Sequence, residues 1–282
     1  MVLMVRESLP CRVGMRKDVA YSRYYSHTLE ETEMATEAEL PAGSTALVTG
    51  ASSGIGESIA TVLANSGCRV ICAGRQTDKL EDLGQKLGSA ARVLELDVTD
   101  ASSVQSLTSR LPEDWRSIDI LVNNAGHDEG GRRRFDEGSA AQWASIIETN
   151  VNGLIRTTHA VIAGMIERDH GHVVNIGSIA GISPYATGTI YSASKHAVHG
   201  FSESLRLDFA GTGIRVTEIL PGLVRTNFAL NRWGDRARAD AFYDDLGECL
   251  TPEDVARTVL FALRQPPHVV ISQLVVVPSA QR

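Results

Sequence analysis

Two residues four positions apart, Tyr191 and Lys195, carry side chains that can handle a proton together, in a segment with the pattern of a helix. At this spacing both side chains share one helical face. A free tyrosine hydroxyl has a pKa of about 10, and an adjacent positive charge lowers it by stabilising the phenolate. The pair is therefore a candidate general acid and base, in which Tyr191 passes the proton and Lys195 lowers its pKa.

A glycine-rich turn lies between a short apolar run and a helical pattern. Residues 44–49 are predicted to form a strand, and apolar residues recur with helical period from position 55 onward. Gly50 allows a tight turn, Gly54 lets backbone amides approach a pyrophosphate, and Gly56 lets the helix pack close to the strand. Unpaired N–H groups at the start of the helix favour an anion. A glycine-rich turn can be merely a turn, but this context indicates a dinucleotide site.

Arg75 follows the second predicted strand, residues 69–74, where dinucleotide-binding folds contact the adenosine ribose. An acidic side chain there accepts hydrogen bonds from the ribose 2′-OH of NAD, whereas an arginine can pair with the extra phosphate of NADP. Arg75 thus favours NADP over NAD, and the alternative is an ordinary solvated arginine.

Seven apolar runs separated by helical patterns predict a buried parallel sheet. The runs cover residues 44–49, 69–74, 92–98, 118–126, 171–178, 214–222 and 268–278. Right-handed crossovers through the helices give an α/β, doubly wound Rossmann fold with a seven-stranded parallel sheet flanked by helices. One long helix is expected over residues 140–169, with a break near Gly153.

The composition of the 282-residue chain, 43% hydrophobic and 22% charged with a net charge of -7, predicts a globular protein. The negative charge and the lack of an apolar run of roughly 18–20 residues argue against nucleic-acid and membrane partners. The histidines lack ligand-like spacing, so no metal is expected. The cysteines show no paired spacing, which indicates reduced thiols in a cytoplasmic protein; they are Cys11, Cys68, Cys72 and Cys249.

The first 43 residues differ from the rest of the chain. Residues 1–28 are rich in arginine, residues 29–40 are acidic, and neither part has a sustained apolar period. We expect a disordered or poorly ordered extension, with Met15 or Met34 as the natural initiator, followed by one Rossmann-type domain over residues 44–282. An organelle transit peptide is the alternative, although the segment lacks an amphipathic stripe.

From about Thr45 to Gln281 the chain resembles the short-chain dehydrogenase/reductase family. The likeness rests on several motifs in the same order, each weak alone and highly specific together. They are the turn Thr49 to Gly56, Asp97-Val98, Asn123 to Gly126, Asn150, Ser178, Tyr191 with Lys195, and Pro221-Gly222 with Thr226.

The resemblance implies a role for each motif. Tyr191 would donate or accept the proton, Ser178 would hold the substrate oxygen, and Lys195 would also bind the nicotinamide ribose. Asn150 would interrupt its helix and hold a water that links Lys195 to solvent. The implied NADP(H)-binding residues are Gly50, Ser52, Ser53, Gly54, Ile55, Gly56, Arg75, Asp97, Val98, Asn124, Ala125, Gly126, Tyr191, Lys195, Pro221, Gly222, Val224 and Thr226.

Segments of the second half, such as residues 177–186 and 250–255, are similar to NADP-dependent 3-hydroxy acid dehydrogenases of the serine and allothreonine type and to small semialdehyde reductases. Ser183 stands where that group often has Trp. The similarity implies hydride transfer between NADP(H) and a small alcohol or carbonyl substrate, in a homo-oligomer, tetramer or dimer. The alternatives are a 3-oxoacyl-carrier-protein or other ketone reductase, and a dinucleotide-binding sensor without turnover.

Two stretches, residues 127–135 and 223–247, are predicted to border the substrate pocket as long loops, because ligands bind beyond the carboxyl ends of parallel strands. Both contain arginines that can hold a substrate carboxylate or sulfonate. The alternative is a basic loop that only faces water. The arginines considered are Arg132, Arg133, Arg134, Arg225 and Arg232.

Overall fold

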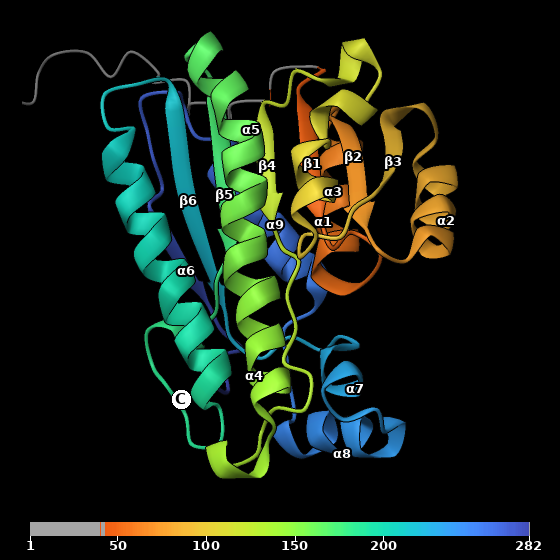
Figure 1. Cartoon of the computed structure of the whole chain (residues 1–282), viewed down its shortest axis with the longest axis vertical. Coiled ribbons are helices and arrows are strands. Elements are labelled where there is room, and N and C mark those ends of the chain that lie inside the picture. The colour runs from red at the N-terminus through yellow and green to blue at the C-terminus, as the bar shows by residue number, and fades with distance from the viewer. Residues whose placement is uncertain (1–39, 41–42, 282) are drawn as a thin grey trace, which may run out of the picture. The chain divides into compact units, whose positions relative to one another are not determined.

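The computed structural model describes residue 40 and residues 43–281, and a sheet of parallel strands forms its centre (Figure 1). The strand order is β3-β2-β1-β4-β5-β6-β7, and every neighbouring pair is parallel. The predicted seven-stranded Rossmann fold is thereby confirmed. The predicted extension, residues 1–43, lies outside the described residues apart from positions 40 and 43. The strands are β1 (Thr45–Thr49), β2 (Arg69–Gly74), β3 (Ala91–Glu95), β4 (Ile120–Asn123), β5 (Gly171–Ile176), β6 (Ile214–Pro221) and β7 (Gln273–Val276).

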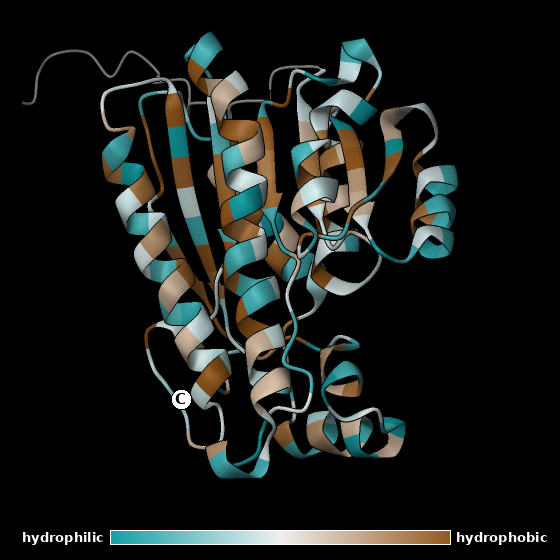
Figure 2. Cartoon of the chain, viewed as in Figure 1, coloured by the Kyte–Doolittle hydropathy of each residue, from teal (hydrophilic) through white to brown (hydrophobic). Residues whose placement is uncertain are grey.

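Helices cover both faces of the sheet, as the apolar strands require: every residue of β1 and of β5 is buried. Figure 2 shows the strands as mainly hydrophobic and the helices as mixed. The α-helices are α1 (Gly54–Asn65), α2 (Thr77–Leu87), α3 (Ala101–Gln105), α4 (Ala140–Ile147), α5 (Leu154–Arg168), α6 (Thr189–Asp208), α7 (Phe228–Trp233), α8 (Arg236–Leu246) and α9 (Pro252–Leu263).

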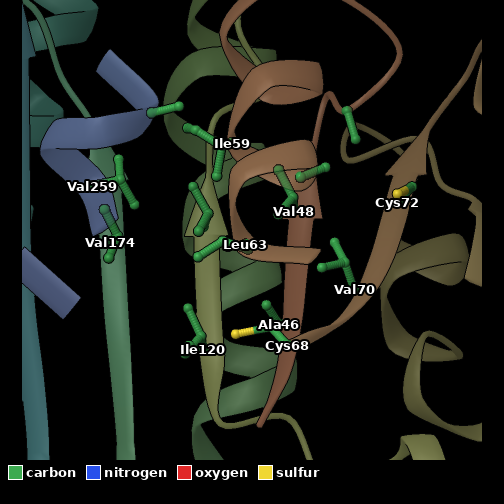
Figure 3. Packing of buried hydrophobic residues seen from close by; sticks show 14 of the residues in the cluster. Ala46, Val48, Ile59, Leu63, Cys68, Val70, Cys72, Ile120, Val174 and Val259 are labelled. Carbon is green, nitrogen blue, oxygen red and sulfur yellow. The ribbon is translucent and has the colours of Figure 1, made fainter. Parts of the chain in front are cut away.

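Two apolar clusters hold the layers together, one on each face of the sheet. On one face, Ile59 of α1 and Val259 of α9 pack with Val174 of β5, as Figure 3 shows. On the other face, Val161 and Met165 of α5 pack over the central strands. Burial of side chains of this size stabilises the fold by about 1.5–3 kcal/mol each.

The strand order changes direction next to β1. The chain runs outward from β1 to β3 and then returns to place β4 on the other side of β1. Ligands of doubly wound folds bind at such a switch point, beyond the carboxyl ends of the strands. The loops after β1, β4, β5 and β6 are therefore the segments that can build the site.

The long helix expected over 140–169 is present, whereas two other expected segments were wrong. The helix predicted over 140–169 is continuous through Gly153, and its irregularity is a π-helical segment, Glu148–Gly153, between α4 and α5. The stretch 223–247 is not a loop, because α7 and α8 form within it; both end at glycines with positive φ, Gly234 and Gly247. The last strand is shorter than predicted because the chain first turns at Pro266, whose carbonyl accepts from Val269 N at 2.8 Å.

Candidate active site

Helix α6 brings Tyr191 and Lys195 to one face, as the spacing predicted. Lys195 is 7% exposed, and its Nζ donates to the carbonyl of Ile176 at 2.8 Å. The same Nζ lies 5.8 Å from the centre of the Tyr191 ring. Ser178 follows β5 directly, so that its hydroxyl lies beside the phenol at the carboxyl edge of the sheet. The three predicted catalytic side chains therefore meet in one place.

The pKa of Tyr191 is shifted in the direction opposite to the expected one. Burial raises the pKa of Tyr191 above its ordinary value, and the hydrogen bond from Ser178 opposes this only in part. The Lys195 ammonium donates to the carbonyl of Ile176, so that its effect on the phenol stays a prediction. Burial also lowers the pKa of Lys195 to about 8, while the carboxylate of Glu218 acts in the opposite direction. Near neutral pH the phenol thus carries its proton, as a proton donor must.

Asn150 lies in the π-helical segment and is 2% exposed. Its Nδ2 donates to the carbonyl of His127 at 3.0 Å and to Ser194 Oγ at 3.1 Å, and its Oδ1 accepts from His127 N at 2.9 Å. π-Helical turns are rare and occur frequently at functional sites. Asn150 ties the loop after β4 to the helix that carries Lys195, whereas its role in holding a water stays a prediction.

The glycine turn has the geometry that close approach of a phosphate requires. Gly50 and Gly54 have φ values of +66° and +59°, which disfavour other residues. A Cβ on Gly56 would lie 2.3 Å from the carbonyl oxygen of Gly50, so that only glycine fits there. The Ser53 side chain does not cap α1, which leaves the first-turn amides available to an anion.

The loop after β4 is fastened to this turn by hydrogen bonds. Thr49 Oγ1 accepts from the backbone N–H groups of Asn124 and Ala125 at 3.0 and 3.1 Å. Asn124 Nδ2 in turn donates to the carbonyls of Thr49 and Gly50 at 3.0 and 3.2 Å. These contacts join the loops that follow β1 and β4, and both loops line a cavity.

The cavity has a volume of about 430 Å³, within the usual range for small-molecule sites. Ser178, Tyr191 and Lys195 line it. The predicted cofactor residues that also line it are Gly50, Ser53, Gly54, Ile55, Asn124, Ala125, Gly126, Pro221, Gly222, Val224 and Thr226.

Five predicted cofactor residues and Asn150 do not line the cavity. Gly56 packs beneath the turn, and Val98 packs against Gly153. Asp97 uses its carboxylate to accept from the N–H and hydroxyl of Thr99 at 2.9 and 2.7 Å. Arg75 is exposed at the end of β2, and Ser52 also lies outside the lining. Their predicted contacts with NADP(H) remain predictions.

Aromatic residues that the sequence left without a role also line the cavity. Tyr185 comes from the loop after β5, and Phe242 and Tyr243 come from α8. The only available signal was their place in segments that follow the carboxyl ends of strands. Together with Phe228, whose ring meets Tyr191 edge-on at 5.7 Å, they make part of the lining apolar.

The five arginines considered for substrate binding have different surroundings. Arg232 lines the cavity but is buried and paired, with Nε 2.8 Å from Asp128 Oδ2. Arg225 and Arg134 pair with exposed carboxylates, and Arg133 does not line this cavity. Arg132 lines it and has no carboxylate oxygen within 4.0 Å in the described part of the chain.

Arg132 is held in place by aromatic rings and by its loop. Its guanidinium lies 5.0 Å from the centre of the Tyr185 ring and 4.9 Å from that of Phe242. The residue has a φ of +56°, a conformation that is strained for a residue other than glycine. Gly130 N donates to the carbonyl of Arg232 at 3.0 Å, which anchors the loop on α7.

Among residues 40 and 43–281, no three His, Cys, Asp or Glu side chains are grouped so that they could bind a metal ion. Within the same residues, no helix is long and apolar enough to cross a bilayer.

Comparison with known proteins gives consistent matches. The family model for short chain dehydrogenases matches residues 44–237. An NADP-dependent 3-hydroxy acid dehydrogenase of Escherichia coli is 43% identical over 237 residues, which cover 83% of this chain and 95% of the relative. A sulfoacetaldehyde reductase of Chromohalobacter salexigens is 41% identical over 239 residues, covering 83% of this chain and 94% of the relative.

Solved structures agree with these matches. The closed form of a serine dehydrogenase complexed with NADP⁺ superposes with a TM-score of 0.82 at 42% identity, covering 84% of this chain and 96% of that one. An actinorhodin polyketide ketoreductase with NADPH gives a TM-score of 0.74 at 34% identity, with 83% and 95% covered.

Proposed function

The chain belongs to the short-chain dehydrogenase family, and we propose that its substrate is a small 3-hydroxy acid or the corresponding semialdehyde or keto acid. It is an NADP(H)-dependent oxidoreductase of small hydroxy or carbonyl compounds. The observation that carries the proposal is one cavity that is lined by Ser178, Tyr191 and Lys195 and also by Arg132. The relatives named for 3-hydroxy acids, serine and sulfoacetaldehyde all have acidic substrates by name, which supports an acid as the ligand of this cavity.

The glycine turn supports an NADP(H) site. The positive φ of Gly50 and Gly54 and the uncapped start of α1 fit a pyrophosphate. Arg75 would pair with the 2′-phosphate, and Thr226 and the backbone after Pro221 would hold the carboxamide. When bound, the nicotinamide ring supplies or accepts the hydride.

The side chains of the chain itself handle the substrate oxygen and its proton. In the reducing direction Ser178 holds the carbonyl oxygen and Tyr191 gives it a proton. Burial keeps the phenol protonated until that step, because it raises the pKa of Tyr191. The Lys195 ammonium then stabilises the phenolate that remains, since opposite charges attract strongly where water is excluded.

Arg132 would hold the acid group of the substrate. A guanidinium can bind a carboxylate or sulfonate through two parallel hydrogen bonds. Arg232 is a poorer candidate, because its charge is already balanced by Asp128. Arg132 thus brings to the cavity wall a positive charge that an acidic substrate can neutralise.

A panel of substrates tests the proposal. We would assay 3-hydroxy acids, small semialdehydes and neutral aldehydes of equal chain length with NADP(H) and NAD(H) in parallel. The proposal expects the highest kcat/KM for an acidic compound with NADP(H). Preference for neutral ketones, or for carrier-linked acyl groups, would contradict it.

We also propose a homotetramer in the cytoplasm. Large exposed apolar side chains occur on several elements of the described chain, among them Ile166 on α5, Leu207 on α6 and Phe261 on α9. Burial of such side chains between copies of the chain would support a closed, symmetric oligomer. The buried thiols of Cys68 and Cys72 are unpaired, which suits a reducing compartment. Light scattering would report the mass of the assembly.

A further inference from the structure

Helix α6 carries a column of polar side chains that continues past the catalytic pair. Tyr191, Lys195, His199 and Glu203 follow one another at intervals of four residues, so that they share one helical face. The column leads from the cavity to the protein surface. The side chain of His199 is 24% exposed and that of Glu203 is 64% exposed.

A buried carboxylate meets this column from β6. Glu218 lies in the middle of the strand and is 1% exposed. Its Oε2 lies 2.7 Å from His199 Nδ1. Its Oε1 has no hydrogen-bond partner in the described part of the chain and lies against Gly177, where a Cβ would be only 2.3 Å away.

The carboxylate and the catalytic ammonium lie along the same short piece of backbone. Lys195 Nζ donates to the carbonyl of Ile176, and Glu218 Oε1 lies against the next residue, Gly177. Strand register explains this, because Glu218 pairs with Asn175 and its neighbour Ile219 pairs with Ile176. The strand partner of Glu218 on the other side is Gln273 of β7, which is neutral.

A carboxylate in this position is unfavourable for folding by itself. A buried polar group that lacks a partner destabilises the fold, and a buried charge does so unless it is compensated. The two cations near Glu218 are Lys195 and, when protonated, His199. Burial raises the pKa of Glu218, and the hydrogen bond from His199 and the charges of His199 and Lys195 oppose this in part. Burial lowers the pKa of Lys195, and the Glu218 carboxylate opposes that.

We propose that Glu218 is a positioning residue for the reaction: its buried carboxylate keeps Lys195 in the ammonium form, and His199 keeps Glu218 ionised and connects it to solvent. The inference rests on the proposed function, because it assumes that the Lys195 ammonium supports proton transfer by Tyr191. It gives the site a polar connection to the surface that is separate from the one predicted through Asn150.

The other charged groups near this column do not replace Glu218. Asp128, Arg232 and Tyr185 act on Tyr191. On α6, Glu203 faces the other ring nitrogen of His199 at 3.7 Å and is largely solvated. Glu218 is therefore the carboxylate whose removal should change the charge on Lys195 most.

The test is the pH dependence of kcat for carbonyl reduction with NADPH. The activity should fall at alkaline pH as Lys195, with a pKa of about 8, loses its proton. Glu218→Gln keeps the shape and removes the charge, so the alkaline fall should move about 1 pH unit lower. Glu218→Asp keeps the charge and should retain the position of the fall. Glu203→Gln, on the exposed neighbour, is the matched control and should superpose on the wild type.

An alkaline fall that stays in place in Glu218→Gln, or moves equally in Glu203→Gln, would overturn the proposal. If Glu218→Gln does not fold, His199→Phe serves instead, because it removes the donor that keeps Glu218 ionised. The alkaline fall of this variant should move in the same direction. A pH profile identical to that of the wild type would again contradict the proposal. Absence of turnover in the wild type would refute the proposed function itself, which is a distinguishable result.

Discussion

Arg232 and Asp128 form a buried ion pair in the wall of the cavity, with 2.8 Å between Nε and Oδ2 and side chains that are 7% and 2% exposed. The pair joins the loop after β4 to α7 across 104 positions of sequence. It also removes Arg232 from the list of free cations that an acidic substrate would meet. Arg132 is left as the arginine of the cavity whose charge is not balanced by a carboxylate within 4.0 Å in the described residues.

Replacing Arg132 with alanine should weaken the binding of acidic substrates selectively. A hydrogen bond to a charged group is worth about 1.5–3 kcal/mol, so KM for a semialdehyde acid should rise about tenfold or more. KM for a neutral aldehyde of the same length should change little. Steady-state kinetics on both substrates give the comparison, with Arg134→Ala as a control in the same loop. Equal changes for both substrates would show that Arg132 does not bind the acid.

Removing the partner of Arg232 should destabilise the fold. Asp128→Asn leaves a buried guanidinium without its counter-charge, which lowers the free energy of unfolding by about 3–5 kcal/mol. Asp244→Asn is the matched control, because Asp244 pairs with Arg225 at the surface, where such a pair is worth up to about 1 kcal/mol. Urea unfolding of the two variants measures both values. Similar losses in both would mean that burial does not strengthen the dependence on the ion pair.

Tyr191→Phe should abolish most turnover without preventing cofactor binding. The substitution keeps the ring that packs against Phe228 and removes only the hydroxyl. Loss of the proton donor should reduce kcat by about 10²- to 10⁴-fold. Tyr185→Phe removes a hydroxyl from the same cavity and should have a much smaller effect. Fluorescence titration with NADPH checks that the binding site persists, and substantial residual activity in Tyr191→Phe would exclude its proposed role.

The sequence predicted the parts of this protein that depend on short spacings. Gly50, Gly54 and Gly56 stand in the order that a phosphate turn requires, and Tyr191 and Lys195 are one helical turn apart. The apolar runs predicted the strands because a parallel sheet is buried on both faces. These features could be predicted from short stretches of sequence, because residues close together in the chain determine them.

Properties that depend on distant partners could not be found in this way. The pairing of Asp128 with Arg232, and of Glu218 with His199, follows from the packing of separate elements. The lowered pKa expected for Tyr191 was wrong because burial, which a spacing does not reveal, has the largest effect on the phenol. The segment 223–247 contains two short helices, α7 and α8, whose ends lie within a polar stretch, so that its sequence pattern is that of a loop.

Arg75→Ala should reduce the preference for NADP(H) over NAD(H). Loss of a charged hydrogen bond to the 2′-phosphate should lower kcat/KM with NADPH about tenfold or more, while the value with NADH stays nearly the same. Lys86→Ala removes an exposed charge at the far end of α2 and serves as the control for net charge. An unchanged ratio of the two cofactors in Arg75→Ala would show that this arginine is only solvated.

Lys195 should make the stability of the cofactor-free protein increase with pH. Its pKa is about 8 in the folded chain and 10.5 in the reference state, because burial disfavours the ammonium. Between these values the unfolded chain binds more protons, so this group adds stability as the pH rises and loses it again as the pH falls toward 8. The rise should be about 2 kcal/mol between about pH 7.5 and 9.5. Urea unfolding across this range measures it, and Lys195→Met, which keeps the length without the charge, should lack the increase. A parallel pH dependence in both proteins would show that Lys195 has no depressed pKa in the folded state.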